Sequence, residues 1–235
     1  GHYFGTGIVH PVDDFSLANP PSNPKLLDAL AKDFIDSKYD IRALERKVLL
    51  SRTYQLTAVP NETNRLDHTN YSHGNIRPMM AEVMVDVLNA ALGATEKFGP
   101  EMADGSRAIE VGASRLQNAS VNYAFRIFGR PPRTTACDCE RAMEPGLPQK
   151  LYLMADPAIQ QKLQTKQGRL SKLLAAFNDD NAVLDELFLA TVSRLPTAKE
   201  RASFAEHRAD NKDRQSAFVD TLWALINTHE FVFNH

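Results

Sequence analysis

Apolar residues recur at helical spacing in the first part of the chain. After Pro24, one face carries an apolar stripe made of Leu26, Leu27, Leu30, Ala31 and Phe34. After Asp40, a second face carries Ile41, Leu44, Val48 and Leu49. This spacing predicts two amphipathic helices whose apolar stripes are buried. Asn23 is suited to cap the first of them, with Pro24 in its first turn.

The rest of the chain is mostly helical in pattern. Pro78 opens a strong helix that Gly93 closes, and 118–128 forms another. The remaining predicted helices are 147–155, 156–165, 168–177, 180–193, 197–210 and 213–228. Thr197 and Glu200 form a capping box at the start of one helix. In the last helix the core-facing stripe is Phe218, Leu222, Leu225 and Ile226, with Trp223 at its flank.

Three segments lack a steady period. Residues 1–24 are irregular, 58–77 read as a long polar loop, and 94–117 as a loop with a short strand at 108–112. The fold class is therefore mainly α: an irregular multi-helix bundle with long ordered loops and at most a short strand pair. We expect a single helical domain over 1–235. A division into sub-lobes 1–128 and 129–235 is compatible with this pattern.

Composition narrows the function classes. The 235 residues are 43% hydrophobic and 24% charged, typical of a soluble globular domain. Lys and Arg number 27 and Asp and Glu 29, so the net charge is 27 − 29 = −2. This balance argues against nucleic acid as a partner, and no apolar run approaches the roughly 20 residues of a transmembrane segment. Because the chain lacks an initiator Met, we expect a fragment of a longer multidomain protein.

The stretch RPPRTTACDCERAMEPGLPQ at 130–149 concentrates the candidate chemistry. Cys137 and Cys139 either pack a corner as small apolar side chains or serve a metal or redox role. The arginines of this stretch are Arg130, Arg133 and Arg141. They either pair with Glu140 and Glu144 or form a pocket for an anion or a carbohydrate carboxylate.

Other catalytic candidates are sparse. His10 with Asp14 could supply a base and a carboxylate, although a turn stabilised by Asp13 and Asp14 is the simpler interpretation. The sequence contains no GxSxG, HExxH, P-loop or GxGxxG motif. It also lacks CxxCH, so it predicts no covalently held haem c and no cofactor in this chain other than a metal at Cys137 and Cys139.

Five ordered segments carry a family resemblance. They are FGTGIVHPVDDFSLANPPSNPKLLDALAKDF, SRTYQLT, FGRPPRTTACDCER, LFLATVSRLPTAKE and LWALINTHEFVFNH. They resemble the C-terminal domain of unknown function number 1553 of large secreted proteins abundant in planctomycetes. The resemblance implies an extracytoplasmic protein in which domain of unknown function number 1549 and a cytochrome-c-like domain lie upstream. In that family more chain normally precedes the FGxG motif, so we expect a missing N-terminal segment.

Two hypotheses from different classes follow. The first is an interaction scaffold that holds an upstream haem-c or catalytic domain, with polysaccharide as the material processed; a large apolar surface patch would mark the docking face. The alternative is an active site for oxidative or hydrolytic processing of a glycan. Its candidate residues are Tyr54, Glu140, His10 and Asp14, with Arg52, Arg130, Arg133 and Arg141 for binding and Tyr3, Tyr71 and Tyr123 as aromatic platforms.

Overall fold

The computed structural model describes residues 1–112, 116–131, 146–211 and 213–234. These residues form two compact units. The N-terminal unit is Gly1–Arg77 and the C-terminal unit is Pro78–Asn234. The sub-lobe boundary at residue 128 stays a prediction; the compact units instead divide between Arg77 and Pro78. Most of the stretch that concentrates the candidate chemistry lies outside the described residues.

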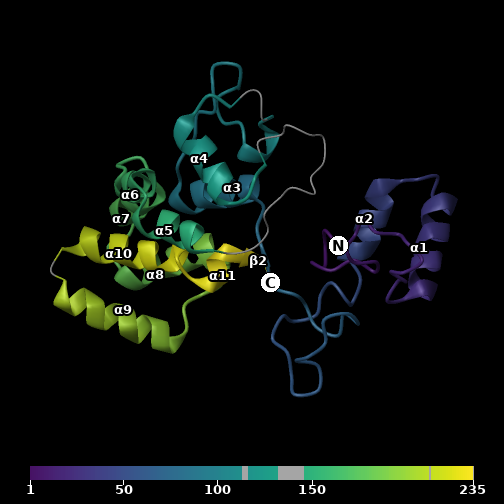
Figure 1. The fold of residues 1–235 in the computed structure, drawn as a ribbon. Helices are drawn as coiled ribbons and strands as arrows, with labels where there is room; N and C mark the ends of the chain where they lie inside the picture. Colours follow the sequence, from purple (N-terminus) through teal and green to yellow (C-terminus); the bar gives the residue numbers. More distant parts are fainter. Residues whose placement is uncertain (113–115, 132–145, 212, 235) are drawn as a thin grey trace. The chain divides into compact units, whose positions relative to one another are not determined.

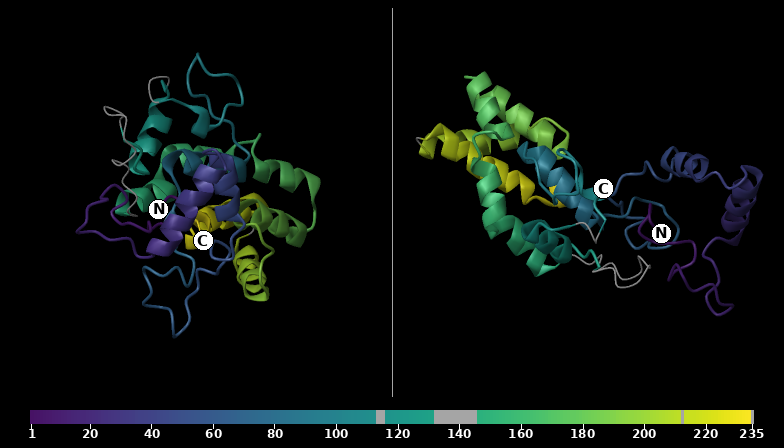
Figure 2. Two further views of the ribbon diagram at one scale, coloured as in Figure 1. Left: turned by 90° about the vertical axis from the view of Figure 1, so that its right-hand side faces the viewer. Right: turned by 90° about the horizontal axis from the view of Figure 1, so that it is seen from above.

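The N-terminal unit contains helices α1 (Pro24–Asp36) and α2 (Ile41–Leu49), and the chain from 50 to 76 runs without a helix or strand (Figures 1 and 2). Both predicted helix starts are confirmed. The Asn23 side chain accepts a hydrogen bond from the backbone N–H of Leu26, and the Asp40 side chain accepts one from Ala43, each at 3.1 Å. These caps satisfy backbone donors that have no partner within the helix.

The predicted burial of the two apolar stripes is wrong. Neither helix contains a buried residue. The helical period shows which side chains share a face, but it carries no information about whether another part of the chain covers that face. In this unit no other segment supplies the cover.

A set of side-chain hydrogen bonds ties the first residues to the end of the same unit. The carbonyls of His2, Phe4 and Thr6 accept hydrogen bonds from the side chains of Arg77, Asn75 and Tyr71, respectively. The last two bonds are each 3.0 Å long. These three bonds hold residues 2–6 against residues 71–77.

The C-terminal unit is built from short helices with short connections. In chain order they are α3 (Ala81–Leu92), the 3-10 turn η1 (Ala108–Glu110), α4 (Ala119–Ile127), α5 (Leu147–Ala155), α6 (Pro157–Gln164), α7 (Arg169–Ala176), α8 (Asp180–Val192), α9 (Ala198–Asp210), α10 (Arg214–Ile226) and α11 (His229–Val232). Strands β1 (Arg77–Pro78) and β2 (Phe233–Asn234) form a two-stranded pair. The mainly α fold class is confirmed.

One continuous core lies inside the C-terminal unit, and α3, α8 and α10 contribute much of it. The predicted stripe of the last long helix is confirmed, since Phe218, Leu222, Leu225 and Ile226 are all buried. Gly93 closes α3 in a left-handed conformation with φ of 63°, as a C-terminal glycine is expected to do.

The predicted strand at 108–112 is wrong. Residues Ala108–Glu110 form the 3-10 turn η1 instead. The Asp86 carboxylate on α3 accepts hydrogen bonds from the backbone N–H groups of Ala108, at 2.6 Å, and Ile109, at 3.2 Å. These bonds take the donors that a strand would have offered to a neighbouring strand.

Within the described part of the chain, no helix is both long enough and apolar enough to span a bilayer.

Candidate functional site

The catalytic candidates in the N-terminal unit lie at its surface. The Asp14 carboxylate accepts a hydrogen bond from the N–H of Ser16 at 3.1 Å, and the Asp14 carbonyl accepts one from the Asn19 side chain at 2.8 Å. His10 is exposed, and among the described residues no hydrogen bond or ion pair joins it to Asp14. These contacts are those of a turn, and they do not pair Asp14 with a histidine that could act as a general base.

Tyr54 belongs to a cluster of aromatic rings. It meets Tyr3 and Phe4 edge to face, with ring centroids 6.4 and 5.9 Å apart, and Phe4 meets Tyr71 at 5.4 Å. Edge-to-face contact is a favourable packing arrangement for aromatic side chains. Tyr54 therefore has a packing role in this cluster. Arg52, which lies near it in sequence, is exposed. Catalytic and binding roles for the two residues stay predictions.

Arg130 is the one arginine of the candidate stretch within the described residues, and it is buried. Its Nε lies 3.1 Å from the Glu82 carboxylate on α3, and its Nη2 donates to the Val111 carbonyl at 2.6 Å. The guanidinium also lies 4.4 Å from the centre of the Phe125 ring. A buried charge needs such a partner, and here the arginine joins α3, α4 and the segment after η1.

The other candidates of that stretch, Arg133, Cys137, Cys139, Glu140 and Arg141, lie outside the described residues. Their predicted roles in anion, carbohydrate or metal binding stay predictions. Among the described residues, no group of three or more His, Cys, Asp or Glu side chains is placed to hold a metal ion.

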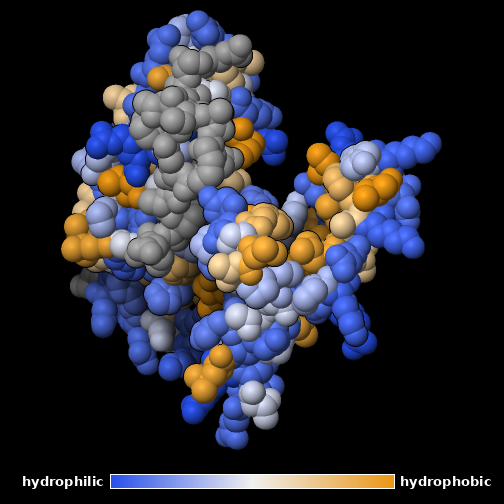
Figure 3. All heavy atoms as spheres, turned by 45° about the vertical axis from the view of Figure 1, so that its right-hand side comes forward, coloured by the Kyte–Doolittle hydropathy of each residue, from blue (hydrophilic) through white to orange (hydrophobic). Residues whose placement is uncertain are grey.

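The exposed faces of α1, α2 and the residue that follows α2 form what we term the N-terminal apolar surface: Leu26, Ile35, Ile41, Leu49 and Leu50. These side chains are between 39% and 63% exposed. Val9 is the single buried hydrophobic residue among 1–77. Hydrophobic residues also appear in orange on the surface of this unit in Figure 3. Exposed apolar side chains mark an interaction site when they form one contiguous patch.

Charge does not dominate this unit. Residues 1–77 contain nine Lys and Arg and nine Asp and Glu, so their formal net charge is 9 − 9 = 0. One ion pair joins α1 to α2, between Asp33 and Lys47. The unit as a whole therefore offers no net charge that would attract an oppositely charged partner.

A second candidate lies in the C-terminal unit, between α9 and α10 over the surface of α8. This α9–α10 groove has a volume of about 760 Å³ and is lined by Leu184, Phe188, Thr197, Lys199, Glu200, Ser203, Phe204, His207, Asp220, Thr221, Trp223, Ala224, Leu225 and Thr228. Its size and mostly apolar lining are in the range of small-molecule sites.

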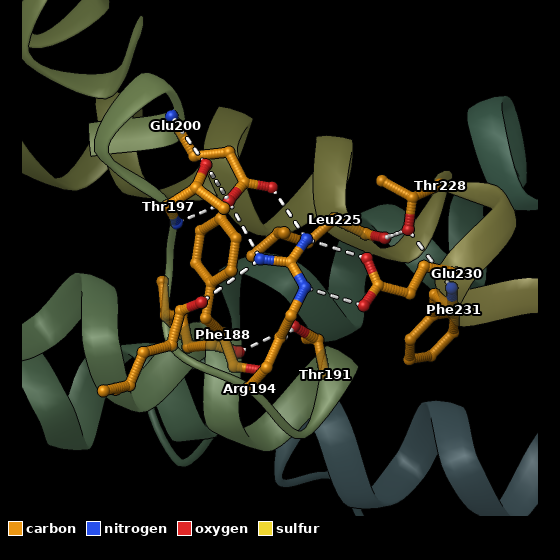
Figure 4. Close-up of polar contacts among 11 residues, drawn as sticks. Phe188, Thr191, Arg194, Thr197, Glu200, Leu225, Thr228, Glu230 and Phe231 are labelled. Atoms are coloured by element: carbon orange, nitrogen blue, oxygen red, sulfur yellow. Dashed lines mark hydrogen bonds and ion pairs between the residues drawn. The ribbon is translucent and has the colours of Figure 1, made fainter. Parts of the chain in front are cut away.

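Arg194 contacts Glu200, one of the residues that line the groove (Figure 4). It follows α8 and reaches two glutamates on different helices. Its guanidinium donates to both carboxylate oxygens of Glu230 on α11, at 2.7 and 2.8 Å, and to both of Glu200 on α9, at 2.9 and 2.8 Å. Bidentate pairs of this kind fix orientation as well as distance. The three residues form what we term the Arg194 clamp.

The Arg194 clamp shifts the acidity of its members. Hydrogen bonds from the Arg194 guanidinium, with further bonds from Thr197, lower the pKa of Glu200 from 4.5 to about 2. Hydrogen bonds to Glu200 and then Glu230 raise the pKa of Arg194. Glu200 also accepts from the Thr197 N–H at 2.7 Å, which confirms the predicted capping box. Arg194 and Glu200 therefore both stay charged over the whole physiological pH range.

A matching cluster holds the other end of α8. Asp180 accepts from Arg208 on α9 at 3.1 Å and from Arg214 on α10 at 2.7 Å. Sequence reasoning placed arginine–carboxylate pairing at 130–141 and missed both clusters. The available signal was the arginine and acid content of 194–214, but the partners Glu230 and Asp180 are far away in sequence.

Comparison with known proteins identifies a family and no activity. Neither the curated proteins nor the solved structures include a match to the chain. The family described as protein of unknown function (DUF1553) matches residues 1–208, most of the chain's 235 residues. The chain belongs to the DUF1553 family.

Proposed function

We propose that this chain is a helical interaction module that binds an upstream domain of the same extracytoplasmic polypeptide, a haem-c or catalytic domain that acts in polysaccharide metabolism. The observation that carries the proposal is the N-terminal apolar surface. The five apolar side chains of this surface are each at least 39% exposed, and residues 1–77 bury one hydrophobic side chain.

Physical reasoning favours a protein surface as the occupant. Burying apolar side chains is the main favourable term in association, about 25 cal/mol per Å² removed from water. The zero net charge of residues 1–77 gives no electrostatic preference for nucleic acid or anionic lipid. The location outside the cytoplasm and the haem-c or catalytic neighbour rest on the family resemblance.

The alternative, an active site for glycan processing, has no observation in its favour among the described residues. The α9–α10 groove and a smaller pocket of about 490 Å³ between 96 and 118 are both lined by residues other than His10, Asp14, Arg52 and Tyr54.

Hydrogen exchange on the chain alone and on the parent polypeptide tests the proposal. In the parent, we expect amides of 24–50 to exchange more slowly than in the isolated chain, while amides of α10 exchange at the same rate in both. The double variant Ile35→Asp and Ile41→Asp should abolish the added protection. Leu195→Asp, at a residue of the C-terminal unit that is 53% exposed, is the matched control.

Two outcomes contradict the proposal. One is equal exchange of 24–50 in the isolated chain and in the parent. The other is protection that rises with the concentration of the isolated chain, because a second copy would then be the occupant.

A further inference from the structure

The α9–α10 groove lies apart from the N-terminal apolar surface and has its own chemistry. Its deepest lining residues are apolar: Leu184 and Phe188 on α8, Phe204 on α9 and Leu225 on α10 are all buried. Trp223 and Ala224 on α10 form part of one wall. An apolar molecule in this groove would contact aromatic and aliphatic side chains on three helices.

Contacts between neighbouring helices hold the residues that line the groove. The rings of Phe204 and Phe218 pack with centroids 4.8 Å apart, and His207 lies 3.2 Å from Asp220 across α9 and α10. The Arg194 clamp ties the start of α9 to α11. A groove of about 760 Å³ held in this way suits a small molecule.

Most charges that line the groove are already paired. Glu200 belongs to the Arg194 clamp, and His207 faces Asp220. Lys199 differs: within the described ranges of the chain, no ion pair or hydrogen bond is formed by its side chain. An anionic group is the natural complement of an apolar groove whose one unpaired lining charge is an ammonium.

The start of α9 does not itself supply the anion site. Thr197 and Glu200 cap it reciprocally, and the Glu200 carboxylate already accepts the Thr197 N–H. The capping box consumes donors that an anion would use and places a negative charge at that helix end. The Lys199 side chain is long and flexible, and it is the group that remains to pair with an anion.

We propose that the α9–α10 groove binds an amphiphilic carboxylate. Its apolar body lies against Phe188, Phe204 and Leu225, and its carboxylate pairs with Lys199. The site goes beyond the proposed docking function and does not depend on it, because it uses a different unit of the chain.

The single tryptophan of the chain makes the site directly measurable. Trp223 lines the groove and is the chain's only Trp, so its fluorescence reports on the groove and not on the N-terminal apolar surface. Octanoate serves as the probe, 1-octanol as the uncharged molecule with the same tail, and acetate as the charged group alone. We expect a saturable change of Trp223 emission with octanoate, a weaker response to 1-octanol and none with acetate.

Variants separate the apolar and charged contributions. Lys199→Met should weaken octanoate binding about fivefold, the size of one partly exposed charge-assisted contact, and leave 1-octanol unchanged. Lys172→Met, an exposed lysine of α7, is the control for overall charge. Ala224→Phe fills the groove from the α10 wall and should weaken both ligands. Ser203→Phe on α9 repeats that block if Ala224→Phe does not fold by circular dichroism.

The overturning results are specific. The proposal fails if octanoate causes no saturable change, if both blocking variants bind octanoate as well as the unaltered chain does, or if Lys199→Met weakens it no more than Lys172→Met does. None of these results bears on hydrogen exchange at 24–50, so the site and the docking function can fail separately.

Discussion

Helices α2 and α10 both carry a stripe of apolar residues at helical spacing, but the two stripes differ in burial. In α10 the stripe residues Phe218 and Ile226 are fully buried. In α2 the corresponding end residues Ile41 and Leu49 are 61% and 39% exposed. The spacing of apolar residues therefore specifies a helix and a face in both units, but only the C-terminal unit supplies its own cover. Under the proposed docking function, a partner domain would supply the cover that the N-terminal unit lacks.

The largest effects should come from the core of the C-terminal unit. Phe218→Ala removes a fully buried ring that packs on Phe204, and we expect it to lower the free energy of unfolding by about 4 kcal/mol. Ile41→Ala on α2 should cost less than about 0.5 kcal/mol in the isolated chain, because its side chain is already solvated. Urea unfolding measures both; equal losses would remove the contrast between the units.

The buried pair between Arg130 and Glu82 sharpens the contrast. Arg130→Met removes the buried guanidinium that lies 3.1 Å from the Glu82 carboxylate, and we expect a loss of about 3 kcal/mol in the free energy of unfolding. Hydrogen exchange should quicken in α3 and α4 while α1 and α2 are unaffected. Faster exchange across 24–50 in this variant would show that the two units unfold together and would contradict their independence.

The Arg194 clamp should give a smaller, pH-dependent effect. Arg194→Met should cost about 1 kcal/mol at pH 7, since the arginine side chain is 37% exposed. The folded chain holds the pKa of Glu200 near 2, below its usual 4.5, so this stabilisation is present above pH 4.5 and is lost as the pH falls toward 2. Urea unfolding of both proteins should converge at low pH; a constant difference would exclude the clamp as the cause.

The smallest effect is expected at the N-terminal unit's own ion pair. Lys47 and Asp33 are 54% and 39% exposed, and such pairs contribute little in water. Lys47→Met should change the free energy of unfolding by less than about 0.5 kcal/mol, and adding salt should reproduce the effect in the unaltered chain. A loss comparable to that of Arg194→Met would mean that the pair organises this unit after all.

Local signals predicted the fold well. The helix starts at Asn23, Asp40 and Thr197 were predictable because a cap acts on donors two or three residues away. The 3-10 turn at Ala108 was not, because its cause is the Asp86 carboxylate on another helix.

The candidate sites were less predictable, since they depend on distant parts of the chain. The Arg194 clamp joins residues 36 positions apart, Arg194 and Glu230, and the groove exists only where α8, α9 and α10 meet. The exposure of α1 and α2 is a tertiary property as well. A helical period cannot reveal it, because the same pattern serves a core and an interface.

The three hydrogen bonds that hold the carbonyls of His2, Phe4 and Thr6 have a mechanical consequence. They fasten the entry of the N-terminal unit to its exit at residues 71–77. A pulling force applied along the polypeptide would be carried by these three hydrogen bonds and not by helices α1 and α2 between them. Under the proposed docking function, stretching the parent polypeptide would leave α1 and α2 folded, and optical-tweezer traces would lack an early release of about 65 residues.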